Sequence, residues 1–526
     1  MSGPARRLAI AAAAIAAGLA AALAHPPFGL LPGFLGYPLL MWLVDRASGD
    51  RPLRSAFWRG WLAGFAYFAV GCWWVAEAFL VDARQAWMAP FAASLLPAGL
   101  GLFWGAACAL YRRIAPAHVG RVLVFAAALG LCEWLRGHVL TGFPWNLPGE
   151  TWVAGGAVSQ AASVVGAYGL TILTLFVWAS LAPLAAPGPR KARVGMAAAG
   201  MIVLAGLWTF GAMRLAGAQV RYGETTVRVV QADVPQQDKW DEAAFRAIVL
   251  RYVNLTARAN GARAPDVVIW PEGALPAAAE DLLAPEAWTR DAIAGALAPG
   301  QTLLMGTYRG ERQPDGEVKY FNSLAALTRR GRDLVPTGVY DKHRLVPFGE
   351  YLPLEALLQP LGVKELVHVG DGFSPGPRPA PMSLPGLPTF QPLICYESLF
   401  PGLADPGGRP RWIVNVSNDA WFGRTSGPLQ HLNLASYRAI EQGMPIVRAT
   451  PTGVSAIVDP WGRVDDDHRL DPGESGVIDA LLPEPLENSY FSRVGDLGFW
   501  ALVALGFLVA APVREWARRS RHQHET

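Results

Sequence analysis

Apolar residues dominate two stretches of this chain, and a stretch of ordinary polarity lies between them. They concentrate in residues 8–215 and again in 495–513. A membrane-spanning helix needs about 20 predominantly apolar residues. The pattern therefore predicts a multi-pass α-helical membrane protein that carries one globular domain. Eight spans are predicted, at 8–24, 28–44, 60–80, 88–111, 122–140, 160–185, 194–213 and 495–513.

Basic residues lie in every second segment outside the predicted spans. Clusters of Arg and Lys precede the first span, follow the second, fourth and sixth, and follow the eighth. The alternate loops hold little more than Arg84 and Arg136. Because basic loops stay in the cytoplasm, we expect both termini there. The expected domains are seven helices in 1–213, an outward-facing domain in 214–494, an eighth helix in 495–513 and a cytoplasmic basic tail in 514–526.

The polar stretch alternates short apolar runs with segments of helical periodicity. Interleaved strands and helices of this kind predict a layered α/β domain. The stretch 374–388 is rich in Pro and Gly and reads as a loop. Expected strands lie at 227–231, 267–270, 302–306, 322–328, 412–416 and 455–459, and expected helices at 241–260 and 287–297.

The composition supports a membrane protein and singles out one cysteine. Twenty Trp residues, 17% charged residues and a mean hydropathy of +0.23 are unusual for a soluble chain. The net charge of +3 is small, and we expect no nucleic-acid partner. Cys72, Cys108 and Cys132 lie in apolar helical segments, where Cys is usually a small buried hydrophobe. Cys395 has no partner in its own domain, and a lone thiol facing an oxidising compartment indicates reactivity.

Three apolar runs of the outward-facing domain each end on a residue with reactive chemistry. Glu272 follows the first, Lys342 the second and Cys395 the third. A cysteine nucleophile needs a base for its proton and a cation that stabilises thiolate and oxyanion. Each residue alone also has an ordinary explanation, as a solvated loop carboxylate, a surface amine or a buried thiol. The polar residues after Cys395, Tyr396 and Glu397, argue against a fully buried thiol.

Taken together, these segments resemble the nitrilase (carbon–nitrogen hydrolase) superfamily and, within it, the apolipoprotein N-acyltransferase family. The resemblance implies an extracytoplasmic αββα sandwich with a Glu–Lys–Cys triad of Glu272, Lys342 and Cys395. It covers nearly the whole chain, including eight spans with the domain between the last two. The motifs that carry it are Trp270-Pro-Glu272, Lys342-x-x-Leu-Val-Pro-Phe-Gly-Glu-Tyr351, Cys395-Tyr-Glu397, Ser417-Asn-Asp-Ala-Trp-Phe-Gly423 and Gly427-Pro-x-Gln-His431.

The resemblance also implies a reaction and its partners. Cys395 would attack an ester of a membrane phospholipid, and the resulting thioester would pass its acyl chain to the α-amine of a diacylated apolipoprotein. Glu272 would be the general base, and Lys342 with the backbone N–H of Tyr396 would stabilise the oxyanion. No cofactor and no metal are expected. The expected location is a bacterial cytoplasmic (inner) membrane, with the catalytic domain in the periplasm.

Further residues match family positions near the triad. Glu350 and Glu397 would orient Lys342 or adjust the local charge, although a surface salt bridge is the ordinary alternative. Trp240 resembles a position near the substrate entrance, and Asn322 one that supports the Lys342 loop. The remaining two expected supporting residues, which would scaffold the pocket, are Asn418 and Asp419.

Two other functions stay open from the sequence. A membrane-tethered amidase or nitrilase would use the same triad with water as second acceptor. A transporter or receptor would use the outer domain only to bind a ligand, and Glu77 and Glu133 are the intramembrane acids that such a protein would need. The apolar loop 141–149 is expected to be an aromatic belt loop at the membrane surface, with contact to acyl chains as the alternative.

Overall fold

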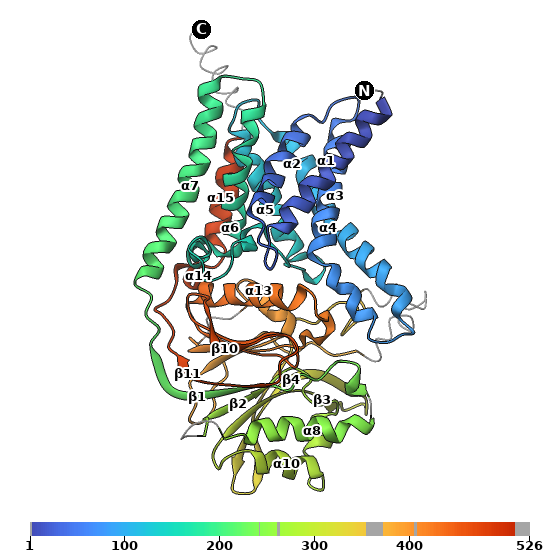
Figure 1. Ribbon diagram of the computed structural model, residues 1–526, viewed down its shortest axis with the longest axis vertical. Helices are drawn as coiled ribbons and strands as arrows, with labels where there is room; N and C mark the ends of the chain where they lie inside the picture. Colours follow the sequence, from blue (N-terminus) through green and yellow to red (C-terminus); the bar gives the residue numbers. More distant parts are fainter. Residues whose placement is uncertain (1–2, 241, 260–263, 354–371, 404–407, 511–526) are drawn as a thin grey trace.

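The computed structural model describes residues 3–240, 242–259, 264–353, 372–403 and 408–510. Helices from the N-terminal part and from the C-terminal end form one half of the molecule, and two β-sheets with their helices form the other (Figure 1). The expected basic tail, 514–526, lies outside the described residues.

Every predicted span contains a helix, but not every helix is long enough to cross a membrane alone. Four helical segments among the described residues are long and apolar enough, and a bent pair, Pro52–Gly71 with Trp73–Phe79, adds a fifth. Two further apolar helical segments are shorter, Leu31–Asp45 and Leu497–Leu508. The count of eight spans therefore stays a prediction. The helices of this half are α1 Gly3–Leu23, α2 Gly36–Asp45, α3 Pro52–Gly71, α4 Ala89–Ile114, α5 Arg121–Arg136, α6 Ala162–Ala179, α7 Arg190–Ala216 and α15 Leu497–Leu508.

The other half contains a six-stranded and a five-stranded sheet. The first has the order β11-β1-β2-β3-β4-β5 and the second the order β10-β9-β8-β7-β6. Strands β1, β2 and β3 are mutually parallel, as are β6, β7 and β8. The strands are β1 Tyr222–Gln231, β2 Val267–Trp270, β3 Thr302–Arg312, β4 Val318–Arg330, β5 Asp333–Asp341, β6 Phe390–Ile394, β7 Trp412–Val416, β8 Ile446–Ala449, β9 Ser455–Val458, β10 Val464–Leu470 and β11 Gly476–Pro483.

The sheets are the two central layers of an αββα sandwich, which confirms the expected fold class. Residues such as Val229 and Ile269 of the first sheet pack against Trp412 and Val414 of the second. Helices α8 Glu242–Ala257 and α10 Trp288–Ala296 cover the outer face of the first sheet. Helix α13 Gly427–Gln442 covers the second, and short helices α9 Ala279–Leu282 and α14 Tyr490–Val494 complete the domain.

The helical half and the sandwich share one apolar core. Residues Leu434 and Ile440 of α13 and Ile413 of β7 belong to the same buried cluster as Tyr67 and Trp104 of the membrane helices. Helix α13 lies directly below those helices (Figure 1). Nearly all of α13 is buried although its sequence is polar. The hydrophobic pattern did not reveal this helix, because its polar side chains face protein partners and not water.

Polar contacts fasten α13 to the membrane half. The Arg438 guanidinium pairs with Glu441 at 2.7 Å and lies 3.5 Å from Glu150 of the loop before α6, and all three side chains are buried. The backbone N–H of Ala167 in α6 donates to Glu441 at 2.8 Å, and Tyr437 donates to the carbonyl of Gly149 at 3.0 Å. One buried arginine thus pairs with Glu441 and lies close to Glu150 between the two halves.

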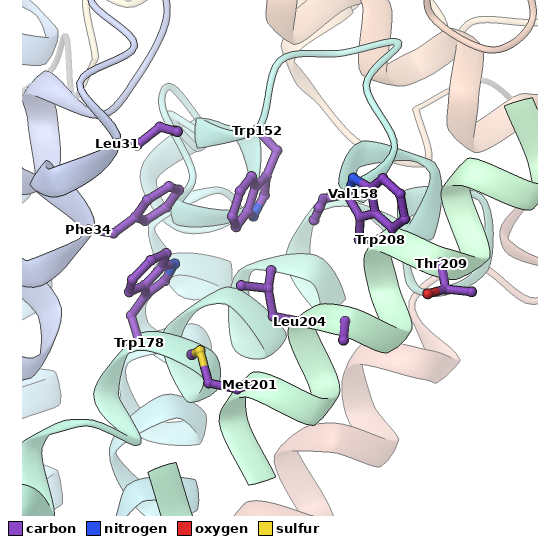
Figure 2. Close-up of a pocket in the computed structure, with 10 residues that line it drawn as sticks. Leu31, Phe34, Trp152, Val158, Trp178, Met201, Leu204, Trp208 and Thr209 are labelled. Atoms are coloured by element: carbon purple, nitrogen blue, oxygen red, sulfur yellow. The ribbon is translucent and has the colours of Figure 1, made fainter. Parts of the chain in front are cut away.

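The membrane half also has an apolar groove of about 460 Å³ (Figure 2). Phe34 stacks on Trp152 and Trp178 to form one wall, and Met201 and Trp208 of α7 form the other. None of the predicted site residues lines this groove. Helix α7 is apolar and little buried along its length, so the groove lies on an exposed apolar face and apart from the predicted chemistry.

We predict that Arg438→Met destabilises the protein by about 3–5 kcal/mol, because it leaves Glu150 and Glu441 buried without a counter-charge. Thermal unfolding in detergent, followed by Trp fluorescence, measures the change. The matched control is Arg290→Met, which breaks an exposed pair with Asp333 and is expected to cost less than about 1 kcal/mol. Equal melting temperatures for the two variants would contradict this account of the interface.

Candidate active site

Four strands deliver the predicted triad and its neighbours to one edge of the sandwich. Glu272 comes two residues after β2, Lys342 directly after β5, Cys395 directly after β6 and Asn418 two residues after β7. Asn322 lies near the start of β4, which runs antiparallel to β3 and β5. The carboxyl ends of the parallel strands and the start of β4 meet at this edge, so the side chains converge from both sheets.

The carboxylate of Glu272 is held by three donors. Its Oε1 atom accepts from Asn322 Nδ2 at 2.7 Å and from Lys342 Nζ at 3.1 Å. Its Oε2 atom accepts from the backbone N–H of Asn418 at 2.7 Å. Burial raises the pKa of Glu272, but Lys342, Asn322 and a hydrogen bond with the Cys395 thiol outweigh it and hold that pKa below its ordinary value. The carboxylate is therefore ionised beside the thiol.

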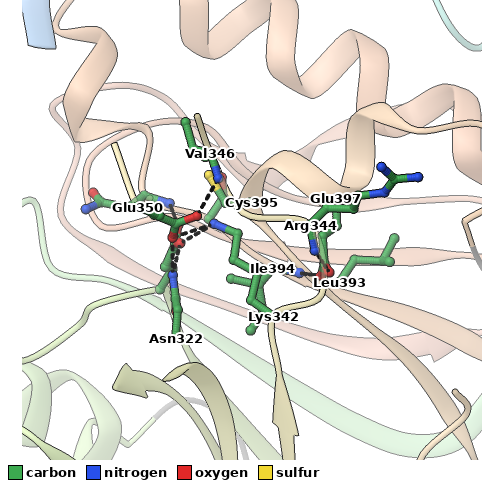
Figure 3. A network of polar contacts seen from close by, with 12 residues as sticks. Asn322, Lys342, Arg344, Val346, Glu350, Leu393, Ile394, Cys395 and Glu397 are labelled. Atoms are coloured by element: carbon green, nitrogen blue, oxygen red, sulfur yellow. Dashed lines mark hydrogen bonds and ion pairs between the residues drawn. The ribbon is translucent and has the colours of Figure 1, made fainter. Parts of the chain in front are cut away.

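Lys342 lies between two carboxylates, those of Glu272 and Glu350, and Figure 3 labels the second of them. Its Nζ atom is 3.1 Å from Glu272 Oε1 and 2.9 Å from Glu350 Oε1, and only 1% of the residue is exposed. Asn322 Nδ2 also donates to Glu350 at 2.7 Å. Burial lowers the pKa of Lys342, but Glu272 and Glu350 outweigh burial and hold it well above its ordinary value. The ammonium is thus fixed in its charged form beside the thiol.

Cys395 occupies a strained turn at the end of β6. Its φ angle is +52°, in the left-handed region that costs a residue with a Cβ about 1–3 kcal/mol. Burial first, and Glu272 second, raise the pKa of the Cys395 thiol to about 12, while Lys342 opposes them. The thiol is therefore neutral at rest. Cys395 is buried but not fully, with 8% of it exposed, in agreement with the expectation from the polar residues that follow it.

Glu397 joins the turn of Cys395 to the loop of Lys342 (Figure 3). Its Oε2 atom accepts from the Ile394 N–H at 2.7 Å, and its Oε1 atom accepts from Tyr340 and from the His343 N–H at 2.7 and 2.8 Å. The backbone N–H of Arg344 also donates to Oε1 at 3.1 Å. Burial raises the pKa of Glu397 against these donors. The surface salt bridge considered for Glu397 does not form, because the side chain is completely buried.

The remaining predicted residues divide into three cases. Asn418 lies within the site, since its backbone holds Glu272 and its side chain bonds Gln236 at 3.1 Å. Asp419 lies behind it and pairs with Arg448 at 2.8 Å. Trp240 ends a short 3₁₀ turn, and its side chain lies outside the described residues.

Sequence reasoning missed several polar residues around the site. Lys239 is buried and donates to the Gly273 carbonyl at 2.8 Å, and Ser417 donates to Asp419 at 2.9 Å. Ser398 and His431 form a further contact at 3.1 Å. Ser417 directly follows β7 and therefore does carry the strand-end signal. Lys239, Ser398 and His431 carry none, and only their place beside motif residues could have suggested them. Within the described ranges, no three His, Cys, Asp or Glu side chains are arranged to hold a metal ion.

The membrane half covers the site through the loop that precedes α6. The hydroxyl of Tyr396 donates to the Gly142 carbonyl, and Trp145 Nε1 donates to Gln430 of α13 at 3.0 Å. Arg344 of the lysine loop donates to the Thr141 carbonyl at 3.1 Å. The expectation of an aromatic belt loop over 141–149 is wrong: most of the loop is buried, with Trp145 against the sandwich and Asn146 and Gly149 against the membrane helices. Its Pro and aromatic residues pack against protein and not against lipid head groups.

Glu77 and Glu133, the two acids in the predicted spans, lie near the covering loop and the motif after β7. Glu133 pairs with Arg136 and accepts from Trp104 Nε1 at 2.6 Å, and Arg136 also donates to the Phe143 carbonyl. Both members of this ion pair are buried. Glu133 thus has a structural partner that fixes the covering loop. Glu77 is half-buried and packs beside Gly423, close to the motif that follows β7.

Comparison with known proteins agrees with this architecture. Residues 17–180 match the apolipoprotein N-acyltransferase N-terminal domain, and residues 226–486 match the carbon-nitrogen hydrolase domain. Apolipoprotein N-acyltransferases are similar along nearly their whole length. The protein from Caulobacter vibrioides is 57% identical over 96% of this chain and 94% of its own. Those from Brucella melitensis and Rhodopseudomonas palustris are 42% and 39% identical, over 90% and 94% of this chain and 90% and 93% of their own.

The first match ends at residue 180, directly after α6, and the second begins at residue 226 within β1, so α7 lies between the two matched domains. An acyltransferase of this kind is a bacterial membrane enzyme, in agreement with the apolar helices. The chain belongs to the apolipoprotein N-acyltransferase family, within the nitrilase superfamily.

Proposed function

We propose that this protein transfers an acyl chain from a membrane phospholipid, through a thioester on Cys395, to the N-terminal α-amine of a diacylated apolipoprotein. The observation that carries the proposal is the buried contact of Lys342 Nζ with Glu272 Oε1, beside the Cys395 thiol, whose pKa both groups influence. Glu272, Lys342 and Cys395 lie together beneath the loop of the membrane half that precedes α6. Triacylated lipoprotein and lysophospholipid are the products.

In the first half-reaction, Cys395 Sγ attacks the ester carbonyl of the phospholipid as Glu272 takes the thiol proton. The carbonyl oxygen becomes an oxyanion, which Lys342 Nζ and the Tyr396 N–H stabilise. Collapse of this intermediate breaks the ester C–O bond. The leaving alkoxide takes the proton from Glu272 and departs as lysophospholipid, which leaves the acyl chain on sulfur.

The pKa values explain why the thiol stays inert until a substrate arrives. The pKa of Cys395 is about 12, and that of Glu272 lies below its ordinary value. The proton therefore does not move to Glu272 at rest. It moves as the C–S bond forms, when negative charge passes to an oxygen that Lys342 faces. A neutral thiol also resists oxidation, because the thiolate is the reactive form.

In the second half-reaction, the α-amine of the apolipoprotein attacks the thioester and Glu272 takes a proton from it. The intermediate collapses with cleavage of the C–S bond, and the sulfur recovers a proton from Glu272. The amine as acceptor rests on the relatives, whose names specify an apolipoprotein and N-acylation. A water molecule as acceptor would make the protein a lipid hydrolase. The buried site favours the amine, because it keeps water from the thioester.

We further propose that Glu350 and Glu397 orient Lys342 and its loop, that Asn322, Asn418 and Asp419 support the triad, and that Trp240 lies at the entrance. The proposed location is the inner membrane, with both termini in the cytoplasm and the catalytic domain in the periplasm. The distribution of basic residues between the predicted spans supports this orientation. The transporter alternative is disfavoured, because Glu133 is already neutralised by Arg136.

We predict that Cys395→Ala abolishes acyl transfer to a diacylglyceryl-cysteine peptide. Purified protein, phospholipid labelled in its acyl chain and the peptide are incubated together, and the acylated peptide is measured by mass spectrometry. Cys132→Ala, which removes a thiol of the membrane half, is the control and is expected to keep its activity. Transfer by the Cys395→Ala variant would contradict the proposal. Release of free fatty acid in place of acylated peptide would favour the hydrolase.

We predict that Glu272→Gln slows both half-reactions by about 10²–10⁴-fold, because an amide of the same shape cannot accept the proton. Single-turnover measurements follow acylation of Cys395 and then transfer to the peptide. Glu317→Gln makes the same chemical change at an exposed position, and both rates are expected to stay unchanged. Normal acylation in Glu272→Gln would rule out Glu272 as the base.

A further inference from the structure

A chain of buried hydrogen bonds runs behind Cys395 and takes no direct part in the reaction above. His431 Nδ1 lies 2.9 Å from Asp419 Oδ1, and His431 Nε2 lies 3.1 Å from Ser398 Oγ. The Ser398 hydroxyl lies 2.9 Å from the carbonyl oxygen of Cys395. Each of the three side chains in this Asp–His–Ser chain is about 1% exposed. The chain ends on the backbone of the nucleophile and not on its sulfur.

The contact at the end of the chain is with the peptide group that joins Cys395 to Tyr396. A trans peptide is planar, and its C=O and N–H point in opposite directions. Fixing the Cys395 carbonyl therefore fixes the direction of the Tyr396 N–H, which is the proposed oxyanion donor. This peptide needs support, since Cys395 has a left-handed φ of +52°. The hydroxyl of Ser398 supplies it from the side away from the substrate.

The bond from Ser398 alone would be ordinary. Serine hydroxyls in helical turns often bond a carbonyl three or four residues earlier. The partners behind Ser398 are not ordinary, because a hydroxyl has one hydrogen and here meets two groups that can accept it. One is the Cys395 carbonyl and the other is His431 Nε2, whenever that nitrogen has no hydrogen.

The environment of His431 decides how that hydrogen is used. Arg448 and the Ser417 hydroxyl both donate to Asp419, and Arg448, despite burial, holds the pKa of Asp419 far below its ordinary value. An ionised carboxylate only accepts, so His431 Nδ1 carries a hydrogen. When Nε2 carries one as well, Ser398 accepts from the ring and gives its own hydrogen entirely to the Cys395 carbonyl. When the ring is neutral, the two acceptors compete for that hydrogen.

The charged groups that face the imidazole are Asp419, which follows β7, and Arg448 of β8, while the rings of Trp145 and Phe422 pack around it. Burial and then Arg448 lower the pKa of His431, and Asp419 opposes them. The carbonyl contact is therefore complete only below the pKa of the ring, which lies under the ordinary value of a histidine. As the pH rises through the pKa of the ring, the contact weakens.

We propose that Ser398 and His431 are positioning residues, which hold the Cys395–Tyr396 peptide so that the Tyr396 N–H faces the oxyanion during acylation of Cys395. The inference deepens the proposed function and rests on it. The inference predicts different effects on two reactions of the Cys395 thiol, acylation and alkylation. Attack on an ester creates an oxyanion, whereas alkylation by iodoacetamide displaces iodide and creates none. Loss of the chain therefore slows acylation and leaves alkylation unchanged.

The test compares both rates at Cys395 in the full-length protein in phospholipid-containing micelles. Mass spectrometry of the Cys395 peptide follows the acyl adduct in one series and the iodoacetamide adduct in the other. Ser398→Ala is expected to lower the ratio of acylation to alkylation about 2- to 10-fold, as for the loss of one hydrogen bond. Ser398→Thr keeps the hydroxyl and is expected to restore the ratio. An unchanged ratio in Ser398→Ala, or an equal fall of both rates, would overturn the inference.

A second experiment at His431 tests the inference without relying on the stability of the Ser398→Ala variant. In the wild type, the ratio of acylation to alkylation is expected to fall as the pH rises through the pKa of His431. In His431→Gln, whose amide donates to Ser398 at every pH, the ratio is expected to be flat with pH. The same pH profile in both proteins would also overturn the inference. Failure of the wild type to form any acyl adduct would instead contradict the proposed function.

Discussion

The buried ammonium of Lys342 is the constraint on which the rest of this site depends. A charge without solvent needs counter-charges, and Glu272 and Glu350 supply two at 3.1 and 2.9 Å. Together the three groups leave one net negative charge beside a neutral thiol. In the proposed mechanism, that balance keeps Glu272 ionised as the base and keeps Lys342 charged beside the place where the oxyanion forms. Removing either carboxylate would leave the other to satisfy the ammonium alone.

The membrane half contributes to the burial of this charged site and is not only an anchor. Its covering loop contacts Tyr396 and the lysine loop, and the buried pair of Glu133 and Arg136 in α5 holds that loop through the Phe143 carbonyl. Helix α13 continues the same apolar core into the sandwich. The nucleophile is therefore covered by the part of the protein that meets lipid. This arrangement suits an acyl donor that is itself a membrane component, and it keeps a thioester away from water.

The sequence predicted the parts of this structure that have simple periodic or strand-end signals. Strands β2 and β7 have the expected bounds, and the convergence of Glu272, Lys342 and Cys395 was expected because each follows an apolar strand. Helix α13 and the loop 141–149 could not be predicted correctly, because their polar and aromatic residues are buried against another domain. The same holds for Ser398 and His431, whose role depends on contacts between segments distant in the chain. The resemblance to a known family suggested the roles of Glu272, Lys342 and Cys395, and the structure added the distances between these residues and their burial.

The central claim is that an acyl chain rests on Cys395 between the two substrates. Mass spectrometry of the intact protein, after incubation with a phospholipid of defined acyl composition, measures this most directly. The account predicts a mass increase of one acyl group on the Cys395 peptide, which hydroxylamine removes and which a diacylglyceryl-cysteine peptide discharges with formation of the triacylated product. Acylated peptide formed by an active preparation that never carries this adduct, or that carries it on another residue, would contradict the account.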